Sequence, residues 1–148
     1  MSNHHPPSPE SRFLTRLLCA ALMVPLLGTA ASAQAAPNCG DTSFGNSFGY
    51  WDDSYTRAGP RAKNTTSYVY MHITSITSGR SIQAHVDAWN GSSYIDASRG
   101  WDYTAGLGTT LLMNWVREDG YNSAAIAYKK AGGAGSVSVS GVWSPDYC

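Results

Sequence analysis

Apolar and polar residues alternate along two neighbouring stretches of the chain, 66–76 and 80–89. An alternation with a period of two residues is typical of a β-strand that buries one side and exposes the other. We therefore expect two strands that turn one apolar side toward the core. The apolar positions of these strands are Val69, Met71, Ile73, Ile82, Ala84, Val86 and Ala88.

The rest of the chain after the N-terminal region also favours short strands. No stretch there repeats apolar residues with the 3.6-residue period of a helix, and glycine and serine separate runs rich in valine, isoleucine, tyrosine and tryptophan. Residues 131–135 are predicted to be a glycine-rich connection. The pattern predicts an all-β domain with strands near 49–55, 66–76, 80–89, 94–97, 109–117, 121–129 and 136–143.

The turn signal Ser78-Gly79 lies between the two alternating stretches and favours a β-hairpin. A two-residue turn would pair residues whose numbers sum to 157, so that the apolar positions share one face. The other face would then place Tyr68 opposite Trp89, Tyr70 opposite Asp87, and His72 opposite His85.

A second hairpin is predicted at Asp119-Gly120, a strong turn dipeptide. It would pair Met113 with Ile126 and Trp115 with Ala124. Both faces of these strands carry apolar residues, which indicates a central strand or a strand beneath a second layer. We therefore expect a small antiparallel β-sandwich, with a partly open barrel as the alternative.

The N-terminal region has the features of a secretory signal peptide. Arg12 and Arg16 precede an apolar stretch, 17–27, which is followed by the small residues Ala31-Ser32-Ala33. We expect cleavage after Ala33, or alternatively after Ala35. The prediction is thus a signal peptide over 1–33 and a single secreted, extracellular β domain over 34–148, with no membrane span because the apolar stretch is too short.

The expected mature chain retains two cysteines, Cys39 and Cys148, because Cys19 would leave with the signal peptide. Exported proteins fold in an oxidising environment, so we expect a Cys39–Cys148 disulfide that joins the two ends of the domain. Two free thiols or an intermolecular bridge are the alternatives. Such a long closed loop would stabilise the fold by about 4–5 kcal/mol.

The charge balance excludes one large class of partners. Ten lysines and arginines match ten aspartates and glutamates, and only 14% of the 148 residues are charged. A nucleic-acid-binding protein needs a basic face, so we expect no nucleic-acid partner. The sequence does not indicate the oligomeric state.

The polar face of the first hairpin is the candidate binding surface. Aromatic rings beside a few polar groups suit a glycan or a protein partner, unless a second sheet covers them. We predict a non-enzymatic site with no cofactor, no metal and no catalytic residue. Its predicted ligand-binding residues are Tyr68, Tyr70, His72, His85, Asp87 and Trp89.

Acid–base or metal chemistry is an alternative for part of this face. Two imidazoles and a carboxylate, His72, His85 and Asp87, would lie close together in the predicted hairpin and could hold a transition metal or transfer protons.

Tryptophan is followed by an acidic residue in Trp51-Asp52-Asp53, in Trp101-Asp102 and, three residues on, in Trp143-Ser144-Pro145-Asp146. The first two share a longer order of residues, Trp-Asp, Tyr-Thr and Ala-Gly. Because the match needs gaps, the alternatives are two similar loops and a chance recurrence. An aspartate at such a position usually caps backbone amides.

The segment Ser140-Gly141-Val142-Trp143-Ser144-Pro145-Asp146 resembles the ending of small secreted proteins of Gram-positive bacteria. With the signal peptide and the short strands, the chain resembles the lactococcin-type bacteriocins, which are small secreted β-sandwiches that act on cell-wall synthesis. The similarity covers seven residues and transfers no functional residue.

These observations leave four functions open. The first expectation is a secreted binding protein that acts on a cell-wall glycan or another envelope component. The alternatives are a bacteriocin-like antibacterial effector and a small metal-dependent or acid–base enzyme. A protein partner, such as a protease inhibited by an exposed loop of this chain, is a further option.

Overall fold

The computed structural model describes residues 35–133 and 135–148. The predicted signal peptide, 1–33, lies outside the described residues. The described part is all-β: it contains nine strands, every strand pairing is antiparallel, and no helix is present. None of its segments is therefore a helix that could span a membrane.

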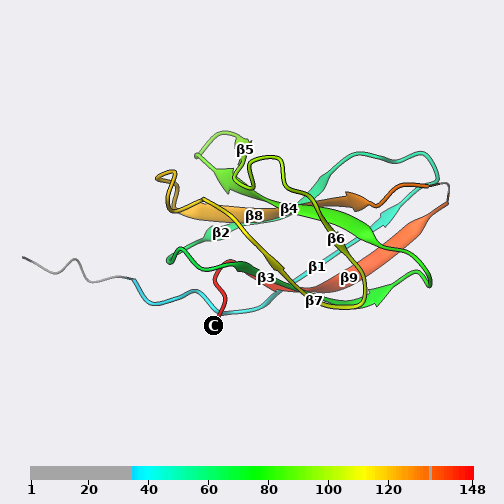
Figure 1. Ribbon diagram of the computed structural model, residues 1–148, viewed down its shortest axis with the longest axis horizontal. Coiled ribbons are helices and arrows are strands. Elements are labelled where there is room, and N and C mark those ends of the chain that lie inside the picture. Colours follow the sequence, from blue (N-terminus) through cyan, green and yellow to red (C-terminus); the bar gives the residue numbers. More distant parts are fainter. Residues whose placement is uncertain (1–34, 134) are drawn as a thin grey trace, which may run out of the picture. The chain divides into compact units, whose positions relative to one another are not determined.

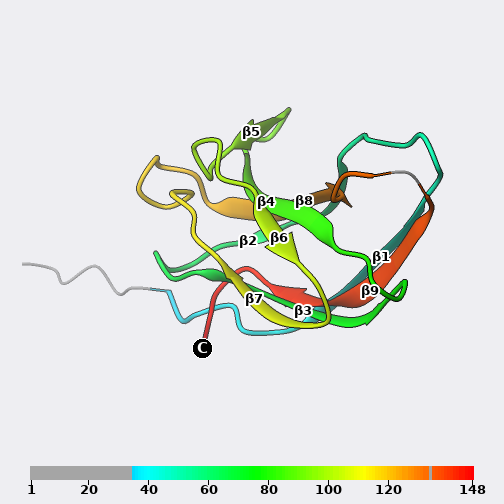
Figure 2. The ribbon, with the colours of Figure 1, turned by 45° about the vertical axis from the view of Figure 1, so that its right-hand side comes forward.

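The strands form two sheets that pack face to face (Figures 1 and 2). The first sheet has the order β1-β9-β3-β7, and the second has the order β2-β8-β4-β5, with β6 also paired to β4. The predicted β-sandwich is thus confirmed. The strands are β1 (Thr42–Phe48), β2 (Thr56–Ala62), β3 (Val69–Ile76), β4 (Ile82–Trp89), β5 (Tyr94–Asp96), β6 (Tyr103–Ala105), β7 (Gly108–Leu112), β8 (Ser123–Lys130) and β9 (Val137–Ser144).

The core lies between the sheets and contains the apolar positions that the alternation predicted. All seven apolar residues of β3 and β4 named above are at most 1% exposed. They meet Trp143 of β9, Tyr128 of β8, and Phe44 and Phe48 of β1, whose rings contact Tyr128 edge to face. One row of side chains on β1, β3, β4, β8 and β9 therefore forms most of the core, as expected for a sandwich.

The predicted hairpin between 66–76 and 80–89 is wrong. Strand β3 pairs with β7 and β9, whereas β4 pairs with β8, β5 and β6, so the two strands belong to different sheets. Alternation fixes which side of a strand is buried but does not fix its neighbour. Two apolar faces can be buried across a sandwich as well as side by side, and here the connection at Ser78-Gly79 crosses from one sheet to the other.

The hairpin predicted at Asp119-Gly120 is also wrong. Strand β7 ends at Leu112, and the chain then crosses to β8 through a loop. Backbone hydrogen bonds from Asp119 to Trp115 and from Tyr121 to Val116 give this loop a helical turn. Gly120, with a φ of 85°, ends the turn in the left-handed region that favours glycine.

Strands β1, β2 and β6 were not expected, and the strand predicted near 49–55 is a loop between β1 and β2. Strands β1 and β2 consist largely of glycine, serine, alanine, threonine and proline, which have weak β propensity apart from threonine. Both lie at sheet edges, where such residues are tolerated. Pairing with β9 and β8 therefore decides their conformation.

The predicted disulfide joins Cys39 to Cys148, whose Cα atoms are 5.9 Å apart. The first described residues thus lie beside the C-terminus, at one end of the sandwich (Figure 1).

Candidate functional site

The structure separates the six predicted binding residues into two groups. Tyr70 and His72 point outward from β3 in the first sheet, and Tyr68 precedes that strand. His85, Asp87 and Trp89 point outward from β4 in the second sheet. The predicted contacts between the groups are therefore absent. This corrects the proposed trio of His72, His85 and Asp87, because the two histidines lie on opposite outer faces of the sandwich.

The outer face of the first sheet holds a row of rings. Tyr70 lies between His72 and Tyr147, with ring centroids 6.4 Å from each. The Nδ1 atom of His72 is 2.9 Å from Oγ1 of Thr109 on β7. His72 is thus a hydrogen-bonded surface residue of this sheet.

The outer face of the second sheet brings together several charged and aromatic side chains. Strand register places Arg57 of β2, Ala127 of β8 and His85 of β4 in one row, and Ala125, Asp87 and Asp96 in the next. The two alanines are fully buried, so they form a floor beneath longer charged side chains. We call this surface the His85 face, defined by Tyr55, Arg57, Gln83, His85, Asp87, Asp102 and Lys129.

A chain of hydrogen bonds runs across the His85 face. Arg57 Nε donates to Asp87 Oδ2 at 2.6 Å, and His85 Nε2 lies 3.1 Å from Asp87 Oδ1. The other ring nitrogen of His85, Nδ1, lies 2.8 Å from Asp102 Oδ1. The hydroxyl of Tyr55 donates to both oxygens of Asp102, at 2.7 and 2.8 Å. Because both ring nitrogens face carboxylates, the contacts are complete when His85 is an imidazolium.

The pKa values of the network follow from these contacts. Burial alone would lower the pKa of His85, but its hydrogen bonds to Asp87 and Asp102 outweigh burial and raise it above the usual value. Burial would raise the pKa of Asp87, yet hydrogen bonds from His85 and Arg57 lower it. Burial would also raise the pKa of Asp102, but hydrogen bonds from Tyr55 and His85 lower it. Burial and the hydrogen bond to Asp102 raise the pKa of Tyr55.

His85 is therefore expected to titrate above the value of about 6.5 found in unfolded chains. A raised folded-state pKa means that the stabilisation is fully present below pH 6.5 or so and is lost as pH rises through the folded pKa. NMR titration of His85, assigned with the variant His72→Gln, measures this directly. Asp102→Asn should lower the pKa of His85, and a His85 that titrates below 6.5 in the unchanged protein would contradict the network.

One group of described residues could offer ligands to a metal. His85, Asp87 and Asp96 have ligand atoms within 4.8 Å of one another. Each of them already has protein partners, however: Asp96 accepts backbone N–H groups of Ser98 and Gly100, both at 2.7 Å. Metal binding would require His85 to lose a proton and a carboxylate contact. These residues are therefore better described as a network whose polar groups bind one another than as a metal site with free ligand atoms.

The two Trp-Asp loops, to which the sequence pattern assigned no binding role, lie at the His85 face. The hydrogen bond between Tyr55 and Asp102 joins the loop before β2 to the loop before β6. Trp51 and Trp101 in these loops are 86% and 62% exposed. The recurrence of Trp-Asp and Tyr-Thr was the signal that could have identified them.

A cleft of about 410 Å³ adjoins the His85 face. Tyr50, Trp51 and Asp53 line it from the loop, and Gln83 and Lys129 line it from the sheet. Lys130 anchors the loop, since its ammonium donates to the carbonyl oxygens of Gly49 and Tyr50 and lies 3.6 Å from Asp53. Lys129 Nζ lies 4.4 Å from the centroid of the Tyr55 ring. The cleft thus combines exposed rings with an amide, an ammonium and a carboxylate.

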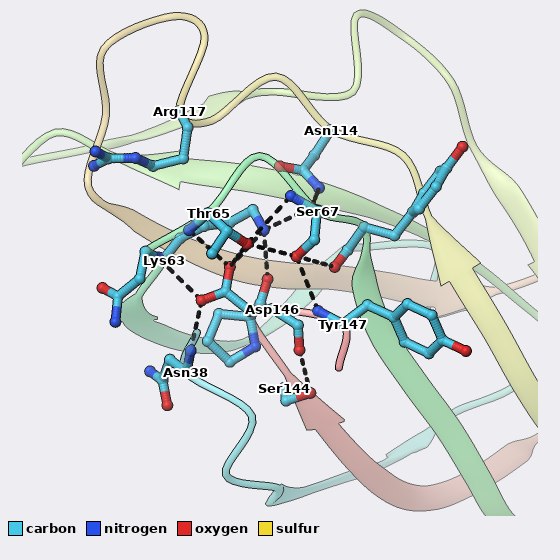
Figure 3. Close-up of polar contacts among 12 residues, drawn as sticks. Asn38, Lys63, Thr65, Ser67, Asn114, Arg117, Ser144, Asp146 and Tyr147 are labelled. Atoms are coloured by element: carbon cyan, nitrogen blue, oxygen red, sulfur yellow. Dashed lines mark hydrogen bonds and ion pairs between the residues drawn. The ribbon is translucent and has the colours of Figure 1, made fainter. Parts of the chain in front are cut away.

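A second polar cluster lies at the disulfide end of the sandwich, where Asp146 and Lys63 are buried (Figure 3). Lys63 Nζ is 3.0 Å from Asp146 Oδ1, and the carboxylate also accepts backbone N–H groups of Asn38, Asn64 and Thr65. These bonds lower the pKa of Asp146 to about 2 although burial acts in the opposite direction. The capping role expected for an aspartate after a tryptophan is met here. The cluster joins the segment around Asn38 to the C-terminal segment and does not form a ligand site.

Comparison with known proteins gives a family but no activity. No curated protein matches the chain. Residues 31–147 match the family described as "Protein of unknown function (DUF2712)", and this match spans most of the 148 residues. The chain therefore belongs to the DUF2712 family.

Proposed function

We propose that this protein is a secreted, non-enzymatic binding protein that recognises an envelope glycan through the His85 face and its two tryptophan loops. The observation that carries the proposal is the exposure of Trp51 and Trp101 on loops joined by the Tyr55–Asp102 hydrogen bond. Two exposed tryptophans on joined loops, beside ordered polar groups, would offer a ligand large apolar contact surfaces.

The polar groups support a hydroxyl-rich ligand. Sugar rings have apolar C–H faces and a rim of hydroxyl donors and acceptors. The cleft offers the Trp51 and Tyr50 rings to such a face, and Gln83, Lys129 and Asp53 offer partners for hydroxyl groups. Its volume of about 410 Å³ falls within the usual range for small-ligand sites.

The protonation states of Asp87 and Asp102 argue against a role for either as the carboxyl acid of glycoside hydrolysis. Glycoside hydrolysis commonly uses one carboxyl group with a raised pKa as an acid and a second that stays ionised. On the His85 face, the pKa values of Asp87 and Asp102 are both lowered. Both are held as carboxylates by their hydrogen bonds, so neither is prepared to donate a proton near neutral pH.

The test is retention of the oxidised protein on insoluble peptidoglycan, chitin and cellulose. We expect one polymer to retain it, and the double variant Trp51→Ala, Trp101→Ala to lose at least about tenfold in affinity. Truncating a tryptophan at the centre of a binding surface commonly costs about 2 kcal/mol or more, and 1.4 kcal/mol corresponds to tenfold.

Tyr147→Ala is the matched control, because Tyr147 is a half-exposed ring that stacks on Tyr70 of the first sheet. It should bind like the unchanged protein. Thermal unfolding of each variant checks that the fold is intact. Failure of all three polymers to retain the protein, or equal retention of the double variant, would overturn the proposal.

A further inference from the structure

A separate pocket of about 230 Å³ opens between the segment before β3 and the loop after β7. Tyr68, Met113, Asn114, Trp115 and Glu118 line it. We propose that this Asn114 pocket is a second binding site and that its ligand is a protonated primary amine. The inference shares no residue with the His85 face and does not depend on the proposed glycan binding.

Asn114 is the residue that first points to a ligand. It is only 5% exposed, and its Nδ2 group donates to the carbonyl oxygens of Ser67 and Leu112, at 3.2 and 3.4 Å. Its buried Oδ1 atom accepts no hydrogen bond from any described residue. Figure 3 shows the amide nitrogen directed at Ser67 and the oxygen turned away from that contact. A buried acceptor without a donor is unusual in a folded protein. Because this oxygen has almost no accessible surface, a ligand donor reaches it only when the carboxamide turns toward the pocket.

The lining groups specify a cationic donor. Glu118 adds an exposed carboxylate, and Tyr68 and Trp115 add aromatic rings, a kind of group that attracts cations. The described residues that line the pocket include no lysine or arginine. An ammonium group supplies N–H donors for the amide oxygen of Asn114 and for the carboxylate of Glu118. Its positive charge also suits the carboxylate and the aromatic rings.

The cations near the pocket already have partners. Arg99 lies 4.5 Å from the centroid of the Trp115 ring and pairs with Asp119 at 3.2 Å. Arg117 donates to Asn122 and to the carbonyl oxygen of Tyr121, and Lys63 is paired with Asp146. The contact of Arg99 shows that the indole of Trp115 accepts a cation on its ring.

The volume of the pocket limits the size of the ligand group that can enter it. Sites for whole small molecules usually enclose about 300–1,000 Å³, so a pocket of about 230 Å³ fits one end group. An ammonium on an unbranched alkyl stem meets this limit, because the stem can lie along the Tyr68 and Trp115 rings and Met113.

An NMR titration tests the proposal with three probes: n-butylammonium, Nα-acetyl-lysine methylamide and the Nε-acetylated form of the latter. We expect both amines to shift the indole N–H signal of Trp115 and the side-chain amide of Asn114 with millimolar dissociation constants. The neutral acetylated probe should bind at least about tenfold more weakly, because it lacks the charge. Tighter binding of the lysine probe than of n-butylammonium would assign the amine to a peptide.

Glu118→Gln is the matched variant, since it removes the charge and keeps the shape of an exposed side chain. It should weaken amine binding about threefold or more and leave polymer retention by the His85 face unchanged. Tyr68→Ala should also weaken amine binding. Absence of shifts at Trp115 and Asn114, or equal binding of the neutral probe, would overturn the proposal without affecting the glycan proposal.

Discussion

Replacing Asp146 with asparagine is expected to lower the free energy of unfolding by about 3–5 kcal/mol, because it leaves the buried ammonium of Lys63 without its counter-charge. Both side chains of this pair are fully buried. The carboxylate also receives the hydroxyl of Thr65 and three backbone N–H groups. Urea unfolding of the oxidised protein measures the loss.

The same carboxylate predicts how stability depends on acid. Burial would raise the pKa of Asp146, but its hydrogen bonds lower it from 3.8 to about 2 on folding, which stabilises the folded protein by something on the order of 2 kcal/mol. A lowered folded-state pKa means that this stabilisation is present above pH 4 or so and is lost as pH falls toward 2. Asp146→Asn should lack this part of the acid dependence.

Asp119→Asn is the control for Asp146→Asn, because Asp119 pairs with Arg99 on the surface and both side chains are exposed. Exposed pairs of this kind contribute about 0–1 kcal/mol. The double variant Lys63→Met, Asp146→Asn should recover part of the lost stability, since it removes the unpaired charge. Equal stabilities of Asp146→Asn and Asp119→Asn would show that the buried pair does not hold the chain ends.

Removing the disulfide by Cys39→Ser, Cys148→Ser is expected to cost about 4–5 kcal/mol. The bridge joins residues 109 positions apart, so it removes a large amount of conformational freedom from the unfolded chain. Asn38, the neighbour of Cys39, donates its backbone N–H to Asp146 at 2.7 Å. Loss of the bridge therefore also loosens one contact of the buried pair.

Urea unfolding with and without a reducing agent checks the disulfide prediction. Reduction should destabilise the unchanged protein by the same amount as the double serine variant and should not affect that variant. Because the bridge and Asp146 share contacts, their combined loss should differ from the sum of the separate losses. A change below about 1 kcal/mol on reduction would contradict the prediction.

The fold class could be predicted from the sequence because alternation is a local property. The alternation predicts that the side of β3 with Val69, Met71 and Ile73 is buried, and all three are buried in the structure. The partner of β3 depends on residues far along the chain, such as Trp143 and Leu112, which pair with Met71 and Val69. Turn signals at Ser78-Gly79 and Asp119-Gly120 marked chain reversals correctly but not whether the chain stayed in one sheet.

The candidate site could be predicted only in part for the same reason. His85, Asp87 and Trp89 share the outward side of β4, as their spacing implied. Their partners Tyr55, Arg57 and Asp102 come from distant segments, and only the assembled sheet brings them together. No local pattern relates Lys63 to Asp146, which are 83 residues apart.

Ligands are expected to bind where Trp51 and Trp101 are exposed. The most direct test titrates the oxidised protein with soluble fragments of the retained polymer and follows the indole N–H signals of its five tryptophans. We expect saturable shifts of the Trp51 and Trp101 signals and no shift of the Trp143 signal, because Trp143 is fully buried in the core. Saturable binding that leaves the signals of Trp51 and Trp101 unchanged would contradict this expectation.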